Sequence, residues 1–231
     1  MIVLSNSPSA TGTTDRPADP GDPTDLPLVV CLDDVNPTPK DIVGPRAGRL
    51  SRAMRAGLPV PAGSVLTAAA LGCCDQQSRS RTFTSADAID ELFDSLGRGG
   101  HVPLTIGVSA LSRPGSPADR IVGSHAITSR SELLHTVRRL SATASVLSEE
   151  IALVVQRDID VVTSGTVTAS ASTERVVDSI GPTTDVVDRA LVVDLGRRVS
   201  SVFTGDCVVT WAIDGCGHIW ILDIGPERRD S

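Results

Sequence analysis

The chain has 231 residues, of which 40% are hydrophobic, 21% charged and 2% aromatic, so it can fold as one good-sized domain or two small ones. The net charge of −7 and the scarcity of aromatic side chains argue against a nucleic-acid-binding protein, which needs basic surface and rings for base stacking. No stretch reaches 18 consecutive apolar residues and the start lacks the features of a signal peptide, so we expect no membrane association.

The cysteines and histidines predict neither a disulfide framework nor a metal site. The five cysteines are odd in number and lack regular spacing, which favours free thiols in a reducing, cytoplasmic environment. The four histidines, His101, His125, His135 and His218, show no metal-ligand spacing, so we expect surface or hydrogen-bonded side chains.

Order is expected to begin after a polar N-terminal segment. Residues 1–26 are rich in Ser, Thr, Pro, Asp and Gly, which predicts a disordered tail followed by one folded domain in residues 27–231. Ser129 and Glu132 form a capping-box pattern at the start of a helix. The expected elements up to that point are a strand at 28–32, a helix at 45–56, an extended segment at 60–67, a helix at 85–96 and a strand at 104–108.

The second half of the chain is predicted to consist mostly of strands. The last two should form a hairpin, because Asp214-Gly215-Cys216-Gly217 between two apolar runs is a strong turn signal. The expected strands are 151–156, 166–171, 189–193, 199–204, 208–213 and 218–224. Helices in the first half and antiparallel strands in the second predict an α+β fold without βαβ alternation.

General nucleotide-binding and hydrolase motifs are absent. The sequence contains no GxxxxGK[ST], GxGxxG or GxSxG. One longer passage is informative: DIVGPRA at 41–47 leads into the predicted helix, and AGLPVPAGSVLT at 56–67 follows it. This describes a glycine turn, a helix and a rigid extended return. Amides at such a helix start can hold a phosphate, and the charge of Arg46 would strengthen the grip.

This passage resembles the start of the nucleotide-binding domain of phosphoenolpyruvate synthase and pyruvate phosphate dikinase, where V-G-G-K-x-A precedes A-G-x-P-V-P-x-G. Three later stretches are similar to the family in the same order. They are LTIGVSA at 104–110 with VGS at 122–124, ALVVQR at 152–157 with SGTV at 164–167, and WAID at 211–214 with WILDIGP at 220–226. The resemblance covers residues 41 to 226.

The resemblance implies a two-lobed ATP-grasp-like domain that binds ATP and Mg²⁺. In that family the β-phosphoryl group of ATP passes to a histidine on a separate domain. By the same resemblance, Arg46, Ser109 and Gln156 would bind the nucleotide, and Asp223 would hold the metal.

Several charged positions of the family are changed in this chain. Its arginines fall on Gly107 and Gly225, its metal-binding glutamate falls on Thr210, and the segment at 180–183 lacks another glutamate. We therefore expect an ATP-binding domain of weakened activity, or none when alone, whose acceptor histidine would come from a separate histidine-domain protein. Two alternatives stay open: a non-catalytic binding or regulatory partner of a separately encoded transferase, and an unrelated α+β domain.

Overall fold

The computed structural model describes residues 27–35, 40–75, 85–111, 126–169, 175–180 and 186–226. Several expectations fall outside these residues: the disordered tail at 1–26, the family match at 122–124, the surface position of His125, the end of the strand at 166–171 and most of the segment at 180–183. None of the helices within the described ranges has the length and apolar character needed to cross a bilayer.

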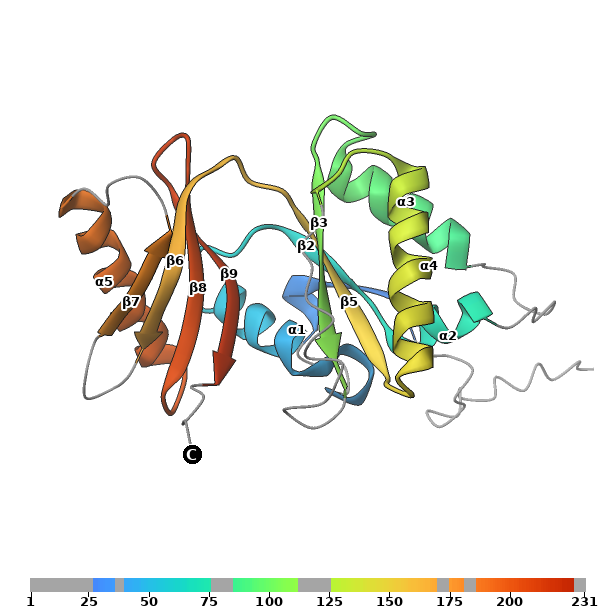
Figure 1. Cartoon of the computed structure of the whole chain (residues 1–231), viewed down its shortest axis with the longest axis horizontal. Coiled ribbons are helices and arrows are strands. Elements are labelled where there is room, and N and C mark those ends of the chain that lie inside the picture. Colours follow the sequence, from blue (N-terminus) through green and yellow to red (C-terminus); the bar gives the residue numbers. More distant parts are fainter. Residues whose placement is uncertain are drawn as a thin grey trace, which may run out of the picture.

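Two antiparallel sheets form two lobes (Figure 1). The first sheet has the strand order β1 (Val29–Cys31), β2 (Gly63–Leu66), β5 (Ile151–Arg157), β3 (Leu104–Ala110) and β4 (Ala126–Ile127). The second has the order β7 (Arg175–Ile180), β6 (Val161–Ala169), β8 (Cys207–Asp214) and β9 (Ile219–Pro226). The two-lobed α+β arrangement with antiparallel sheets that the resemblance implied is thus observed.

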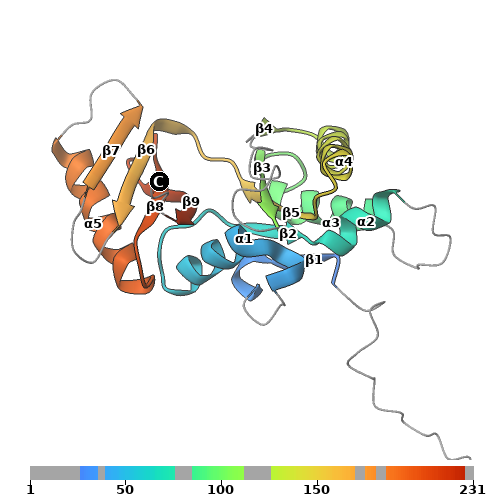
Figure 2. The same cartoon turned by 60° about the horizontal axis from the view of Figure 1, so that its bottom comes forward.

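Helices cover the outer side of each sheet, and one helix lies between the lobes. Figures 1 and 2 show α3 (Ser85–Gly97) and α4 (Arg130–Val146) on the outer side of the first sheet and α5 (Val186–Val202) on the outer side of the second. The short helix α2 (Ala68–Asp75) joins the first group, and a single turn, η2 (Leu32–Asp34), follows β1. Helix α1 (Lys40–Arg55) lies between the two lobes.

Strand β5 is the centre of the first sheet and is buried on both faces. Leu153 and Val155 pack with α3 and α4, whereas Ala152 and Val154 belong to the core that contains α1. The core that contains α1 continues into the second sheet, where it includes Trp211. Burial on both faces explains why residues 151–155 are an unbroken apolar run instead of an alternating one.

The capping box at the start of α4 is confirmed. The Ser129 hydroxyl accepts a hydrogen bond from the Glu132 amide at 3.3 Å. The Glu132 carboxylate accepts one from the amide of Thr128, one residue before the cap, at 3.0 Å. Two amides that the helix cannot satisfy internally are therefore satisfied by side chains.

The strands predicted at 189–193 and 199–204 are wrong, because both stretches lie in or directly after helix α5. The run contains many valines, which favour strands in isolation. Val192, Leu195 and Val199 are buried three and four residues apart, and this spacing places them on one helical face against the second sheet. Burial of that face outweighs the local preference for strand.

Other differences concern the limits of elements. Helix α1 begins at Lys40, before the predicted 45, with a break in its backbone at Gly44, and strand β6 begins at Val161 instead of 166. The helix α2 and the strand β7 were not expected. The strand at 104–108 is confirmed and extends to Ala110.

The hairpin between β8 and β9 is confirmed. One carboxylate oxygen of Asp214 accepts hydrogen bonds from the amides of Cys216 and His218, both at 2.9 Å. The other oxygen accepts one from the Trp220 indole at 2.8 Å. The indole, and after it the backbone amides, stabilise the ionised carboxylate and lower the pKa of Asp214.

Thiol reactivity should follow burial. Burial and, next, the nearby Asp206 raise the pKa of the Cys207 thiol, whereas Cys31 and Cys216 are exposed. Because the thiolate is the reactive form, we expect iodoacetamide at neutral pH to label Cys207 roughly tenfold or more slowly than the exposed pair, as measured by peptide mapping. Equal rates for Cys207 and Cys31 would contradict the burial of Cys207.

Candidate functional site

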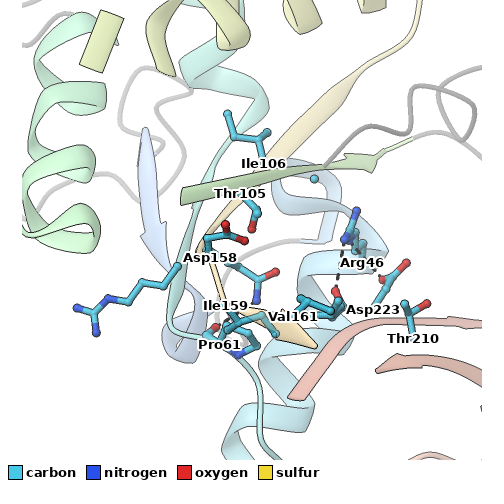
Figure 3. A pocket seen from close by; sticks show the side chains of 13 residues that line it. Arg46, Pro61, Thr105, Ile106, Asp158, Ile159, Val161, Thr210 and Asp223 are labelled. Carbon is cyan, nitrogen blue, oxygen red and sulfur yellow. Dashed lines mark hydrogen bonds and ion pairs between the residues drawn. The ribbon is translucent and has the colours of Figure 1, made fainter. Parts of the chain in front are cut away.

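A cleft of about 290 Å³ opens between the two lobes (Figure 3). Residues from α1, β3, β5, β6, β8 and β9 line it, together with the segments that join α1 to β2 and β5 to β6. The lining residues are Arg46, Pro61, Thr105, Ile106, Gly107, Gln156, Arg157, Asp158, Ile159, Val161, Thr210, Leu222 and Asp223. Both sheets thus contribute to one site.

The break in α1 at Gly44 sets the position of Arg46. Gly44 has φ 73° and ψ 166°, a conformation open almost only to glycine. A Cβ atom there would lie 2.5 Å from the hydroxyl oxygen of Ser109, so the chain also needs glycine for close approach to β3. The Ser109 hydroxyl accepts a hydrogen bond from the Ala47 amide at 3.4 Å. These contacts hold the start of the helix against β3.

Arg46 connects the two lobes across the cleft. Its Nε atom lies 3.3 Å from Oδ1 of Asp223 on β9, and the two side chains are 24% and 38% exposed. Its terminal nitrogens donate long hydrogen bonds to the carbonyls of Val108 on β3 (3.5 Å) and Leu222 on β9 (3.4 Å). Figure 3 shows the guanidinium beside the Asp223 carboxylate, with Thr210 nearby. The single cation of α1 in this cleft is therefore paired, but its hydrogen bonds are long.

Gly107 leaves the space that Arg46 occupies. A Cβ atom at this position would lie 2.4 Å from one terminal nitrogen of Arg46 and 2.6 Å from its Cζ. No side chain at position 107 fits while Arg46 stays where it is. The position of Arg46 therefore depends on glycine at 107, because the guanidinium lies where a side chain at 107 would start.

The return segment after α1 contacts both lobes. The Pro59 carbonyl accepts a hydrogen bond from the Ile221 amide of β9 at 2.7 Å. The Pro61 carbonyl accepts one from the side-chain amide of Gln156 on β5 at 3.1 Å. Gln156 is only 7% exposed, and this bond fixes its side chain at the edge of the cleft. The proline-rich part of the motif thus has a structural role in joining the sheets.

Thr210 and Asp223 are direct partners on neighbouring strands, and both line the cleft. Oδ1 of Asp223 also accepts a hydrogen bond from the Ile224 amide at 2.9 Å. One carboxylate and one hydroxyl therefore stand together where the family resemblance implies two metal-binding side chains. Gly225, further along β9, has only the Val208 carbonyl within 4.0 Å of a Cβ atom, so its position is open.

Three of the four predicted site residues meet in the cleft. Arg46, Gln156 and Asp223 line it, although they lie far apart in the sequence. Ser109 is fully buried beneath the start of α1 and is not among the lining residues. Its observed role is to hold that helix start, and its role toward a nucleotide stays a prediction.

The sequence interpretation missed further polar residues of the cleft. Arg157 and Asp158 follow Gln156 directly, so the quoted motif already contained the signal for Arg157. The Arg157 Nε donates a hydrogen bond to the Leu96 carbonyl at 3.0 Å. Thr105 also lines the cleft, because the pairing of β3 with β5 places it opposite Gln156. No local pattern in the sequence indicates this pairing.

No family model matches the chain, and no curated protein sequence matches it. Solved structures show a likeness at low identity. An N5-carboxyaminoimidazole synthetase from Staphylococcus aureus, complexed with ADP, is 12% identical over 80% of this chain and 44% of its own, with a TM-score of 0.44. Cdc123 from Schizosaccharomyces pombe is 16% identical over 80% and 87%, with a TM-score of 0.48.

A D-alanine-D-alanine ligase from Coxiella burnetii is 13% identical over 77% of this chain and 46% of its own, with a TM-score of 0.45. The chain spans less than half the length of this ligase and of the synthetase. Likenesses with TM-scores below 0.5 identify neither a ligand nor a reaction, and the narrower resemblance to phosphoenolpyruvate synthase stays a prediction.

Proposed function

We propose that the cleft binds ATP with Mg²⁺, weakly, in a shortened and divergent relative of the nucleotide-binding domain of phosphoenolpyruvate synthase and pyruvate phosphate dikinase. The observation that supports this most is the meeting of Arg46, Gln156 and Asp223 in one cleft between two lobes. A cation, an amide and a carboxylate are the groups that a nucleotide and its metal ion require, and each comes from a different part of the chain.

A bound nucleotide would replace the ion pair between Arg46 and Asp223 with a contact between Arg46 and a phosphate group. Both side chains are partly exposed, so the pair itself stabilises the fold by only about 0–1 kcal/mol. A phosphate group would accept hydrogen bonds from the Arg46 guanidinium, whose present bonds to carbonyls are 3.4 and 3.5 Å long. Exchanging the Asp223 carboxylate for a phosphate as the partner of Arg46 therefore costs little free energy.

The carboxylate oxygens of Asp223, once they no longer contact Arg46, are of the kind that binds Mg²⁺. Mg²⁺ takes oxygen ligands and is commonly held by one or two carboxylates together with substrate phosphates. Asp223 and Thr210, adjacent on β9 and β8, would hold it here. When bound, the ion neutralises charge on the phosphate oxygens. One carboxylate is a minimal set, which is consistent with weak binding.

Arg46→Ala should abolish nucleotide binding. Two charge-assisted contacts of the family, each worth roughly 1.5–3 kcal/mol, are missing at Gly107 and Gly225, so we expect a Kd of about 1 mM. About 5 mM Mg-ATP should then stabilise the protein by about 1 kcal/mol and raise Tm by roughly 2–4 °C. The variant should show no rise in a thermal-shift assay.

Arg55→Ala is the matched control, because it removes the same charge from the exposed end of the same helix, away from the cleft. It should retain the ATP-dependent rise. A micromolar affinity for ATP that Arg46→Ala leaves unchanged would show that the nucleotide does not bind at this cleft.

Gly107→Ala should weaken binding without removing any charge. The added Cβ atom would displace the Arg46 guanidinium, which is the movable partner in that contact. We expect roughly a tenfold rise in the Kd for ATP, about 1.4 kcal/mol, measured by calorimetry. Gly225→Ala is the control on β9, outside the residues that line the cleft, since its Cβ atom would meet nothing closer than the Val208 carbonyl oxygen at 4.0 Å. Equal effects of both changes would refute the role of Arg46.

One observation favours a second function, that of a non-catalytic binding partner of a separate transferase. Val161 and Val162, where β6 begins beside the cleft, are 45% and 61% exposed. Adjacent exposed valines suit contact with another protein. Under this alternative, Val162→Asp would reduce binding of a separately supplied histidine-domain protein and leave the thermal shift with ATP unchanged.

A further inference from the structure

The turn between β8 and β9 gathers three side chains that bind metals. Its sequence is Asp214-Gly215-Cys216-Gly217-His218. One ligand atom from each of Asp214, Cys216 and His218 lies within 4.8 Å of the others. Cys216 and His218 are exposed, and Asp214 is partly buried at the end of β8. This group is separate from the residues that line the cleft.

The backbone of the turn holds this arrangement in place. The amides of Cys216 and His218 both donate to one oxygen of Asp214, so the chain curls around the carboxylate. Gly217, with φ 82°, supplies the left-handed residue that the turn requires. The Gly215 amide donates to the Asp160 carbonyl at 3.1 Å, which attaches the turn to the segment before β6. Cys216 and His218 are thereby held close to Asp214.

The second oxygen of Asp214, which also accepts the hydrogen bond from the Trp220 indole, lies close to the imidazole of His218. His218 Nδ1 lies 3.4 Å from Oδ2 of Asp214. In a tetrahedral site with bonds of about 2.0–2.3 Å, neighbouring ligand atoms are roughly 3.3–3.8 Å apart. The carboxylate and imidazole already have this separation, and the Cys216 sulfur lies within 4.8 Å of a ligand atom of each.

We propose that Asp214, Cys216 and His218 form a binding site for a divalent transition-metal ion, for which Zn²⁺ is the best match. Thiolate, imidazole and carboxylate are the ligands that Zn²⁺ takes, whereas Mg²⁺ and Ca²⁺ prefer oxygen alone. Three protein ligands leave one position for water or for a fourth ligand. His218 is exposed, as expected, and the proposal adds a metal role to it because the turn brings it close to Asp214 and Cys216, which the spacing of the histidines alone does not show.

Cobalt spectroscopy tests this site directly. Co²⁺ added to metal-free, reduced protein without nucleotide should produce a thiolate-to-cobalt charge-transfer band, and Zn²⁺ should displace it. Changes of second-shell residues weaken metal sites about 10–100-fold, so loss of a ligand in Cys216→Ser or His218→Gln should weaken binding by at least about 100-fold. Circular dichroism of the metal-free variants should match that of the unaltered protein.

The controls change exposed residues of the same kinds elsewhere. Cys31→Ser and His135→Gln should leave the band and the affinity unchanged. Zn²⁺ should also protect Cys216, but not Cys31, from alkylation, and His218→Gln should remove the protection. Absence of the band in the unaltered protein, its persistence in Cys216→Ser, or its loss in Cys31→Ser would each overturn the proposal. None of these outcomes depends on whether the cleft binds ATP.

Discussion

The purified chain, incubated with Mg²⁺ and ATP labelled at the β-phosphate, should form neither phosphohistidine nor AMP, with or without pyruvate. The reason is the charge needed at the transition state of phosphoryl transfer, where positioned cations and metal ions provide most of the catalysis. Loss of one such donor costs a factor of roughly 10²–10³. Glycine at 107 and 225 and threonine at 210 remove three charged groups that the resemblance implies, so the combined loss should reach several orders of magnitude.

The structure adds a second reason for the expected inactivity. Arg46, the cation that lies against Gly107, is shared with Asp223 and with two backbone carbonyls. His101, His135 and His218 are exposed and outside the set of residues that line the cleft, while His125 lies outside the described residues. Within the described ranges, the cleft therefore contains no histidine to accept a phosphoryl group.

The same incubation with and without a separate histidine-domain protein distinguishes a divided enzyme from a chain that is active alone. Turnover that begins only when a separate histidine-domain protein is added would support a divided enzyme in which this chain binds ATP. Labelled protein or AMP formed by the chain alone would refute the prediction, because Arg46 and Asp223 would then be sufficient for catalysis.

Gly44→Ala should cause a large loss of stability and of ATP binding. The backbone conformation at Gly44 costs a residue with a side chain roughly 1–3 kcal/mol. The added carbon would also lie 2.5 Å from the Ser109 hydroxyl and 3.0 Å from the Ala110 carbonyl, and overpacking of this kind costs about 1–3 kcal/mol. We expect the free energy of unfolding to fall by about 2–6 kcal/mol, which lowers Tm by roughly 4–24 °C.

The effect on binding follows from the position of Gly44 two residues before Arg46. A shift of the helix start away from β3 would carry the guanidinium out of the cleft, so the variant should lose the thermal shift with ATP. Gly48→Ala is the control, because nothing lies within 4 Å of its Cβ position in the same helix. It should stabilise the protein by up to about 1 kcal/mol. Equal stability of Gly44→Ala and the unaltered protein would show that the break in α1 is not needed.

Local patterns in the sequence were sufficient for elements whose signals are contained in a few residues. The cap at Ser129 and Glu132 involves groups three residues apart, and the turn after Asp214 depends on its own amides and glycines. The apolar spacing of helix α3 is likewise visible within one stretch. In each case the stabilising contacts lie within the segment itself, so the sequence by itself determined them.

Helix α5 and the arrangement of the cleft were decided only by the tertiary structure. The valines of α5 favour strand until their helical face is buried against the second sheet, which contributes more free energy than local propensity does. Arg46 and Asp223 are 177 positions apart, and their pairing depends on how α1 lies between the sheets. The sequence shows that residue 107 is a glycine without charge, but only the packed lobes show that Arg46 occupies the space in which a side chain at 107 would lie.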